Sequence, residues 1–233
     1  MGESAAHARE QLAALVARDD VFPLGEQHEW PTNGSTRSSA VLMLFGVLDQ
    51  VPAERQALGV PEDLDLLLIM RSHGLRNHAG QVAFPGGGVD PTDADVIATA
   101  LREAHEETGL DPSGVDVLGT LPDAHIPVSN YLVTPVVGWW RLPSDVVADH
   151  SESVEVFRVP VADLLDPAAR GTAVLSRGRE TFRSPAFRLG HQFGGHVVWG
   201  FTGMLLSGMF EALGWGGEWP REREFEIRLD REA

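Results

Sequence analysis

The sequence contains no cysteine, and this absence excludes several kinds of chemistry at once. Without thiols the chain forms no disulfide bond, offers no cysteine nucleophile and holds no zinc ion through thiolates. A lack of disulfides is typical of proteins in reducing compartments. The N-terminus around Glu3 and Glu10 also lacks the basic flank and apolar core of a signal peptide, so we expect a cytoplasmic protein.

Lysine is absent as well, so all 18 basic residues are arginines, against 34 acidic residues and a net charge of -16. Nucleic acids and anionic membranes are bound through clustered positive charge, and the composition therefore argues against both as the main partner. A phosphate-bearing substrate would have to be attracted through bound cations and a few arginines. The planar guanidinium group suits that task because it can bind two phosphate oxygens at once.

The sequence has no apolar run long enough to cross a membrane. The best candidate, Val197 to Phe210, is shorter than the roughly 20 residues that a bilayer span needs and is followed by Glu211. We therefore expect it to form a buried helix. With 43% hydrophobic residues over 233 positions, the chain can bury a full core, which fits a single domain.

Hydrophobic spacing and turn residues predict strands mixed with a few helices, without internal repeats, which indicates one α/β or α+β domain. The three glycines from Gly86 to Gly88 are expected to form a turn with unusual dihedral angles. The expected helices are Ala5–Val16, Asp95–Glu107 and Trp199–Leu213. The expected strands are Ala40–Leu48, Leu66–Met70, Val82–Phe84, Val115–Thr120, Tyr131–Trp139 and Val154–Val159, with hairpin-like segments near Arg177–Arg179 and Ala186–Gly194.

Three glutamates stand on one face of the helix expected over Asp95–Glu107. Glu103, Glu106 and Glu107 are three and four residues apart, a spacing that brings side chains together on a helix. Like charges placed in this way repel, and two of them lie near the negative end of the helix dipole. A divalent cation with oxygen ligands, such as magnesium, would compensate them. The alternative is a solvated helix face without a ligand.

The residues around these glutamates favour the metal site. From Gly88 through Arg102, Glu103, Glu106 and Glu107 to Gly109-Leu110, the sequence resembles the Nudix box, G-x5-E-x7-R-E-U-x-E-E-x-G-U, where U is apolar. The sequence departs from the box at one position, because Ala94 stands where the box has its first glutamate. Ala94 lies between Asp93 and Asp95. In the family that glutamate helps to brace the loop. Asp95 either takes its place or caps the helix, and we expect the cap.

The resemblance implies a fold, an activity and a set of site residues. The fold would be a Nudix-like α/β/α sandwich with a mixed central sheet. The activity would be hydrolysis of a diphosphate linkage in a nucleotide derivative, supported by Mg2+ or Mn2+. Glu103, Glu106 and Glu107 would hold metal and transfer protons, the Gly87 backbone would add a metal ligand, and Arg102 would orient a carboxylate. Which glutamate is the general base stays open.

The segment before the box resembles a second signature, that of the coenzyme A pyrophosphatase branch, L-L-T-x-x-[SA]-x3-R-x3-G-x3-F-P-G-G. Leu67 to Gly87 fits every fixed position except Ile69, which replaces the threonine. The implied substrate is coenzyme A or a thioester of it, cut into 3',5'-ADP and 4'-phosphopantetheine or its acyl derivative. Two alternatives are ADP-ribose or another nucleoside diphosphate derivative, and a non-catalytic nucleotide-binding module. The implied substrate-binding residues are Arg71, Ser72, Arg76, Gly86 and Gly87.

Nudix enzymes often use a further carboxylate from outside the box. Glu152 or Glu155 is the candidate here, and we predict that Glu155 is the metal ligand. The expected organisation is an N-terminal helix and loop over residues 1–38, a Nudix core over 39–214 and a charged tail over 215–233. A homodimer is left open.

Overall fold

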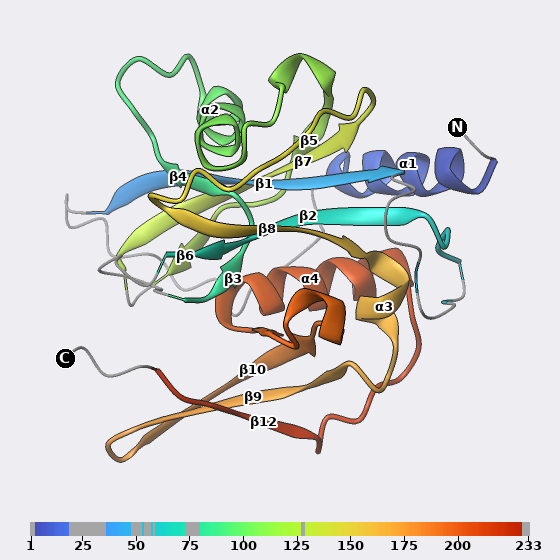
Figure 1. The fold of residues 1–233 in the computed structure, drawn as a ribbon, viewed down its shortest axis with the longest axis vertical. Helices are drawn as coiled ribbons and strands as arrows, with labels where there is room; N and C mark the ends of the chain where they lie inside the picture. The colour runs from blue at the N-terminus through green and yellow to red at the C-terminus, as the bar shows by residue number, and fades with distance from the viewer. Residues whose placement is uncertain are drawn as a thin grey trace.

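The computed structural model describes residues 3–18, 36–47, 53, 57, 59–72, 80–126 and 129–229. These residues form alternating layers of helix and sheet (Figure 1). Helix α2 (Val96–Thr108) covers one face of a larger sheet, and α1 (Glu3–Val16), α3 (Val161–Leu165) and α4 (Gly200–Leu213) lie on its other face. A smaller sheet packs against the far side of α4.

The larger sheet is mixed, as the resemblance implied. Its central strand, β1 (Arg37–Val47), pairs in parallel with β7 and antiparallel with β2 and β4. The strand order is β3-β2-β1-β7-β5, with β4 on β1, β6 on β7 and β8 on β2. The other strands are β2 (Leu64–Arg71), β3 (Val82–Ala83), β4 (Gly86–Gly88), β5 (Val115–Thr120), β6 (Ala124–Ile126), β7 (Tyr131–Trp140) and β8 (Ser153–Pro160).

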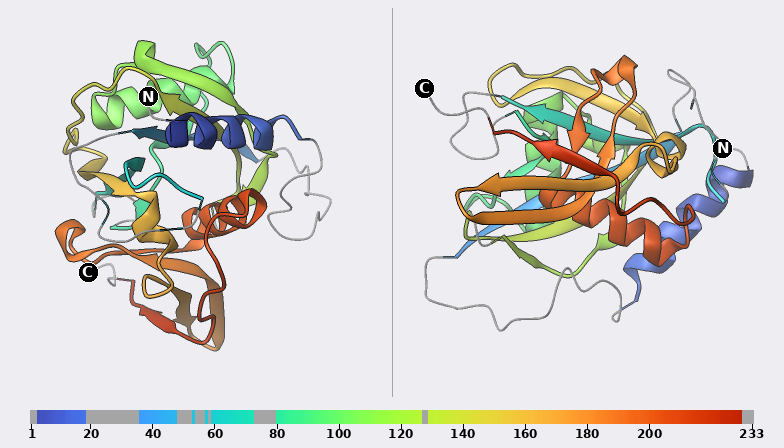
Figure 2. Two further views of the ribbon diagram at one scale, coloured as in Figure 1. Left: turned by 90° about the vertical axis from the view of Figure 1, so that its right-hand side faces the viewer. Right: turned by 90° about the horizontal axis from the view of Figure 1, so that it is seen from below.

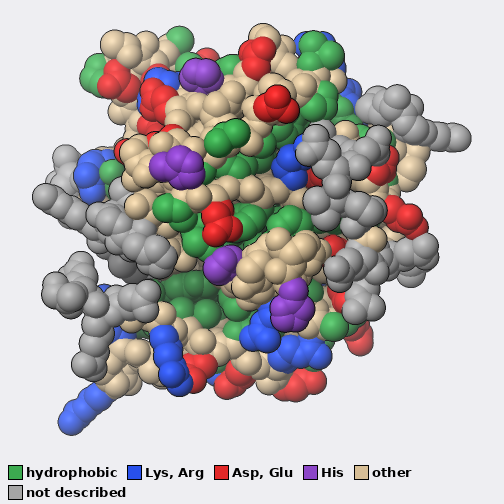
Figure 3. Space-filling view, viewed as in Figure 1, with side chains coloured by type: hydrophobic (Ala, Val, Ile, Leu, Met, Phe, Trp, Pro, Cys, Tyr) green, Lys and Arg blue, Asp and Glu red, His purple; other side chains and the backbone are tan. Residues whose placement is uncertain are grey.

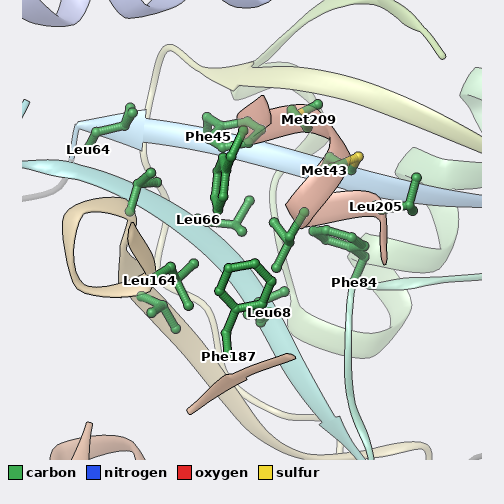
Figure 4. Packing of buried hydrophobic residues seen from close by; sticks show 14 of the residues in the cluster. Met43, Phe45, Leu64, Leu66, Leu68, Phe84, Leu164, Phe187, Leu205 and Met209 are labelled. Atoms are coloured by element: carbon green, nitrogen blue, oxygen red, sulfur yellow. The ribbon is translucent and has the colours of Figure 1, made fainter. Parts of the chain in front are cut away.

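Strand β1 is apolar on both faces because both faces are covered. Leu42 and Leu44 pack with the α2 side of the core, whereas Met43 and Phe45 pack with the α4 side. This explains why the sequence shows a continuous apolar run here instead of an alternation of apolar and polar residues. Figure 4 shows Phe45 and Met43 directed toward α4, together with Leu66 and Leu68 of β2 and Phe187 of the smaller sheet.

Helix α1 adds a stripe of small and apolar side chains to the α4 side. Ala5, Ala8, Leu12 and Leu15 recur at spacings of three or four and are buried. Figure 2 shows α1 beside α4, and the indole of Trp215, just after α4, donates a 2.9 Å hydrogen bond to Gln11 of α1. None of the helices among the described residues combines the length and apolar composition that a membrane span requires.

The smaller sheet is built from the C-terminal third of the chain. Its strands are β9 (Arg170–Arg177), β10 (Glu180–Arg188), β11 (Val197–Val198) and β12 (Glu224–Ile227), in the order β11-β10-β9-β12. Strands β9 and β10 form the expected hairpin around Gly178. Acidic side chains are spread over the face in Figure 3, and arginines gather over its lower part, where this sheet lies.

Two expectations need correction. The segment Gly86–Gly88 is the short strand β4, paired with β1, and only Gly86, at φ 158°, has a dihedral angle unusual for other residues. The segment expected to be a charged tail contains β12, which pairs in parallel with β9. Its charged composition hid the strand because Phe225 alone is buried, between Glu224 and Glu226. The division of the chain at residues 39 and 215 stays a prediction.

Candidate active site

Helix α2 is fixed at both ends by residues that the sequence predicted. The Asp95 side chain accepts a 2.8 Å hydrogen bond from the backbone N–H of Ala98, so Asp95 is the N-cap. Gly109 ends the helix in the left-handed conformation at φ 69°, and its N–H donates to the carbonyl of His105. The two caps fix the ends of the helix, which contacts β4.

Arg102 joins the glutamates of α2 to the preceding loop. Its Nη1 donates to Glu103 Oε1 at 2.9 Å and to Glu106 Oε2 at 3.0 Å. Its Nη2 donates to the carbonyl oxygen of Gly88 at 3.0 Å. One guanidinium group therefore bridges two carboxylates and holds the backbone of the segment that enters the helix.

The other edge of the same guanidinium group is held by Asp93. Nε and Nη2 of Arg102 donate to the two carboxylate oxygens of Asp93 at 2.9 and 3.0 Å. Asp93 also accepts hydrogen bonds from the N–H of Asp90 at 2.9 Å and the hydroxyl of Thr99 at 2.8 Å. The paired guanidinium group and these bonds hold the pKa of Asp93 well below its usual range. Asp93 thus braces the loop at the position next to Ala94.

Glu107 is the most deeply buried glutamate of the group, with 2% of its surface exposed. Its Oε2 accepts a 2.8 Å hydrogen bond from the N–H of Gly86, while Oε1 accepts none and lies 3.5 Å from Nη1 of Arg71. Burial raises the pKa of Glu107 to about 8, although the Gly86 N–H and the charge of Arg71 favour the ionised form. A buried carboxylate oxygen without a hydrogen bond favours binding of a cation at this position.

Gly87 leaves room for the carboxylate of Glu103. A Cβ atom built on Gly87 would lie 2.4 Å from Cδ and from Oε2 of Glu103, whereas one built on Gly88 would meet nothing within 4 Å. The site therefore requires glycine at Gly87. Five residues separate Gly87 from Asp93, the same number as between the first glycine and the first glutamate of the box. Eight residues then separate Asp93 from Arg102, one more than the seven in the box.

The acidic groups suit a hard divalent cation, although they are arranged around arginines. Among the described residues, no three Asp, Glu or His side chains already surround one point. Glu103 and Glu106 instead share Nη1 of Arg102, and Glu107 lies beside Arg71. The available donors are carboxylate oxygens, which magnesium and manganese prefer. A bound metal ion would compete with Arg102 for the oxygens of Glu103 and Glu106.

A comparison with known protein families matches residues 52–177 to the family described as the NUDIX domain. The chain belongs to the Nudix family. It is therefore a Nudix hydrolase, an enzyme of the pyrophosphohydrolase type, and Nudix enzymes generally use a divalent metal ion and act on nucleotide-type substrates.

Two curated relatives and one solved structure illustrate the similarity. A protein of Escherichia fergusonii called "Uncharacterized Nudix hydrolase NudL" is 42% identical over 151 residues, which are 64% of this chain and 75% of the relative. The protein of the same name from Escherichia coli O1:K1 is 55% identical over 102 residues, 43% of this chain and 52% of the relative. The NUDIX domain of Shewanella oneidensis NrtR, solved with ADP ribose, is 22% identical with a TM-score of 0.42, covering 56% of this chain and 77% of that chain.

The structure brings together most of the residues that the Nudix resemblance suggested. Gly86 is engaged through its N–H by Glu107, and Gly87 lies against Glu103. Ser72 lies next to Arg71, and its backbone N–H donates to the carbonyl of Glu152 at 2.8 Å. Arg76 lies outside the described residues. The suggested residues that the structure places in one region are Arg71, Ser72, Gly86, Gly87, Arg102, Glu103, Glu106 and Glu107.

Of the two outside carboxylates, Glu152 is the one near the Nudix helix. Its charge raises the pKa of both Glu103 and Glu107, in addition to the effect of burial. Glu155 is paired with Met70 across β8 and β2, and directly paired residues point to the same face. Met70 packs on the α4 side, so Glu155 points away from α2. The structure therefore does not bring Glu155, the predicted metal ligand, to the site.

Two supporting residues were missed in the sequence. The hydroxyl of Ser153 donates a 2.6 Å hydrogen bond to the backbone carbonyl of Glu107, at the end of α2. Asp149 accepts from the N–H of Ser153 at 2.8 Å and so fixes that serine. Ser153 is 46 positions from Glu107, and no local pattern relates the two. Asp93 had a signal in the sequence, because it lies beside the box position that Ala94 leaves empty.

Replacing Asp93 by alanine is expected to lower kcat by about tenfold or more, the range measured when outer partners of metal ligands are removed. Arg102 then loses its two bonds to Asp93, keeps the bond to the Gly88 carbonyl, and holds Glu103 and Glu106 less firmly. The measurement compares Asp93→Ala with Asp93→Ala/Ala94→Glu, in which the box glutamate is restored. Partial recovery of kcat in the double variant supports bracing by Asp93. Asp90→Ala is the matched control in the same loop, and an equal loss there would contradict the assignment.

Proposed function

We propose that this Nudix hydrolase cuts the diphosphate linkage of coenzyme A or its thioesters, giving 3',5'-ADP and 4'-phosphopantetheine or its acyl derivative. The observation that carries the proposal is the contact between the two sequence signatures. Arg71, from the segment that resembles coenzyme A pyrophosphatases, lies 3.5 Å from Glu107 of the Nudix box. A substrate held by the first segment would therefore have its phosphates next to the carboxylates of the second.

The departure at Ile69 does not weaken this proposal. Ile69 lies within β2, is 0% exposed, and pairs with Val156 of β8 and Ala83 of β3. A side chain at this position contacts the core and not a ligand in solvent. Isoleucine in place of the signature's threonine therefore changes core packing. The residues of the signature that would contact the substrate are Arg71 and its neighbours.

The residues of α2 would hold a magnesium or manganese ion through Glu103, Glu106 and Glu107, with Glu152 as the outside carboxylate. When bound, such an ion neutralises diphosphate charge and lowers the pKa of a bound water. Arg102 positions two of the carboxylates, and Gly86 fixes one oxygen of Glu107. The remaining N–H groups of Arg71, which is 21% exposed as a side chain, are available to phosphate oxygens.

The proposal is tested by mass spectrometry of the products formed from coenzyme A with magnesium, with ADP-ribose and other nucleoside diphosphate derivatives assayed in parallel. We expect 3',5'-ADP and 4'-phosphopantetheine, and no products when EDTA is present. Intact coenzyme A together with cleaved ADP-ribose would favour the alternative substrate class. If no member of the panel were cleaved although nucleotides bound, the non-catalytic alternative would replace the proposal.

A further inference from the structure

Helix α4 lies on the opposite side of the larger sheet from α2 (Figure 1). A cavity of about 430 Å³ opens at its C-terminal end. It lies between the end of that helix, the segment that follows it and the first residue of β9. Its volume falls within the range of small-ligand sites. Its walls are Phe210, Glu211, Gly214, Trp215, Gly216, Gly217, Glu218, Trp219 and Arg221, and Arg170 contributes a buried charge.

Arg170 is the unusual member of this set, because only 4% of its surface is exposed. Its guanidinium group lies between two aromatic rings, 5.3 Å from the centre of Phe187 and 4.8 Å from that of Trp219. Nη2 donates to the hydroxyl of Ser207 at 3.3 Å. Arg170 forms no ion pair with a carboxylate of the described residues, and burial lowers its pKa to about 10. An enclosed guanidinium group without a direct ion pair is costly, and the charge of Glu211 offsets only part of that cost.

The guanidinium group of Arg170 has donors that the bond to Ser207 does not use. A guanidinium group has five N–H donors, and the bond to Ser207 accounts for one of them. Nε and Nη1 form no hydrogen bond with the described residues, yet they are not fully buried. Both atoms therefore keep some access to solvent. Because Arg170 also lines the cavity, a ligand bound there is the candidate partner for these donors.

The carboxylates at the cavity form no direct ion pair with Arg170, although the charge of Glu211 favours its protonated form. Glu211 is 75% exposed as a side chain and lies 3.9 Å from Arg221, which is equally exposed. Charges exposed in this way are screened by water and salt, whereas a buried charge is screened much less. Arg170 is therefore the buried charge at the cavity, although the two glutamates and two arginines that line it balance in formal charge.

We propose that this cavity binds a small organic anion, with a carboxylate or phosphate group on Arg170 and an apolar body against Phe210 and Trp215. The volume is far larger than the roughly 10–15 Å³ that one water molecule requires, so it exceeds the space that a bare oxyanion fills. Phe210 and Trp215 are buried aromatic side chains and form an apolar wall beside the guanidinium group. An anionic group joined to a small apolar body matches both features.

The test is isothermal titration calorimetry with phenyl phosphate, benzoate and the uncharged benzyl alcohol, in EDTA so that metal-dependent binding at the Nudix site is suppressed. We expect the wild-type protein to bind at least one of the two anions more tightly than benzyl alcohol, and the preferred anion identifies the natural anionic group. In Arg170→Met the affinity should fall by about 10-fold to 100-fold, the loss typical of a charged hydrogen bond. Arg188→Met is the matched control, because Arg188 also lies over a ring, at 4.6 Å from Phe225, but does not line the cavity.

Three outcomes would overturn the proposal: no anion binding by the wild type, equal affinity for benzyl alcohol, or unchanged affinity in Arg170→Met. Thermal denaturation shows whether that variant folds. If it does not, Gly217→Phe provides the test, because a Cβ atom on Gly217 meets nothing within 4 Å and the larger side chain would occupy cavity space. Gly217→Phe should then abolish anion binding, and unchanged affinity would contradict the assignment. Diphosphate hydrolysis does not enter this measurement, so the result is independent of the proposed function.

Discussion

Replacing Glu106 by glutamine is expected to lower kcat by about 10³-fold while leaving the protein folded. The amide keeps the size of the side chain but removes the charge that a metal ion requires, and metal ions contribute several kcal/mol of charge stabilisation in such reactions. Glu106 is 55% exposed as a side chain, and its described contact is the 3.0 Å hydrogen bond from Arg102. Loss of an exposed ion pair changes the free energy of unfolding by about 1 kcal/mol at most.

The measurement is kcat at saturating magnesium, with a magnesium titration to separate weakened metal binding from a slower chemical step. Glu155→Gln is the matched control, since it makes the same chemical change on a strand that borders the site but on the opposite face of the sheet. We expect Glu155→Gln to keep the wild-type rate. Unchanged turnover in Glu106→Gln would exclude a metal-binding role for Glu106, and loss of activity in both variants would point to a general effect of charge.

Features set by neighbouring residues were predictable from the sequence. Helix α2 was found with its cap at Asp95 and its stop at Gly109, because each signal lies within one turn of the helix end. The grouping of three glutamates followed in the same way from helical geometry. Strand β5 was also predicted with its observed bounds, Val115–Thr120.

Features that depend on strand pairing were not predictable. The choice between Glu152 and Glu155 rests on the pairing of β8 with β2, in which Glu155 lies opposite Met70 whereas Glu152, just before β8, lies beside Ser72. The contact of Arg71 with Glu107 likewise joins a strand residue to a helix residue 36 positions later in the chain. No periodicity within either segment specifies such a contact, so the sequence alone left these assignments open.

The spacing of the box was misleading at one position for a physical reason. The motif is defined by the number of residues between fixed positions, whereas the position of a side chain depends on the path of the loop. Here the segment between the bracing carboxylate and Arg102 is one residue longer than in the box. The acidic side chain that reaches Arg102 is therefore Asp93, one position before Ala94. The same shift moves the required glycine from Gly88 to Gly87.

Gly87→Ala is expected to lower kcat by about 10²-fold with little change in the melting temperature. The new methyl group would lie 2.4 Å from the Glu103 carboxylate, which must move away. Because the obstructing atoms are the end of a flexible side chain, the backbone can stay in place and the fold is preserved. Glu103 then leaves its 2.9 Å bond to Arg102, and displacement of a catalytic group by about 1 Å can cost about 10²-fold in rate.

The two neighbouring glycines make this prediction specific, and kcat and melting temperature should be measured for all three variants. Gly88→Ala meets nothing within 4 Å and should retain both the rate and the stability of the wild type. Gly86→Ala would place its methyl group 2.3 Å from the backbone oxygen of Ala40, at φ 158°, so it should lower the melting temperature as well as the rate. If Gly88→Ala were as inactive as Gly87→Ala, the box would follow the unshifted spacing, and Asp93 would lose its role as the brace of Arg102.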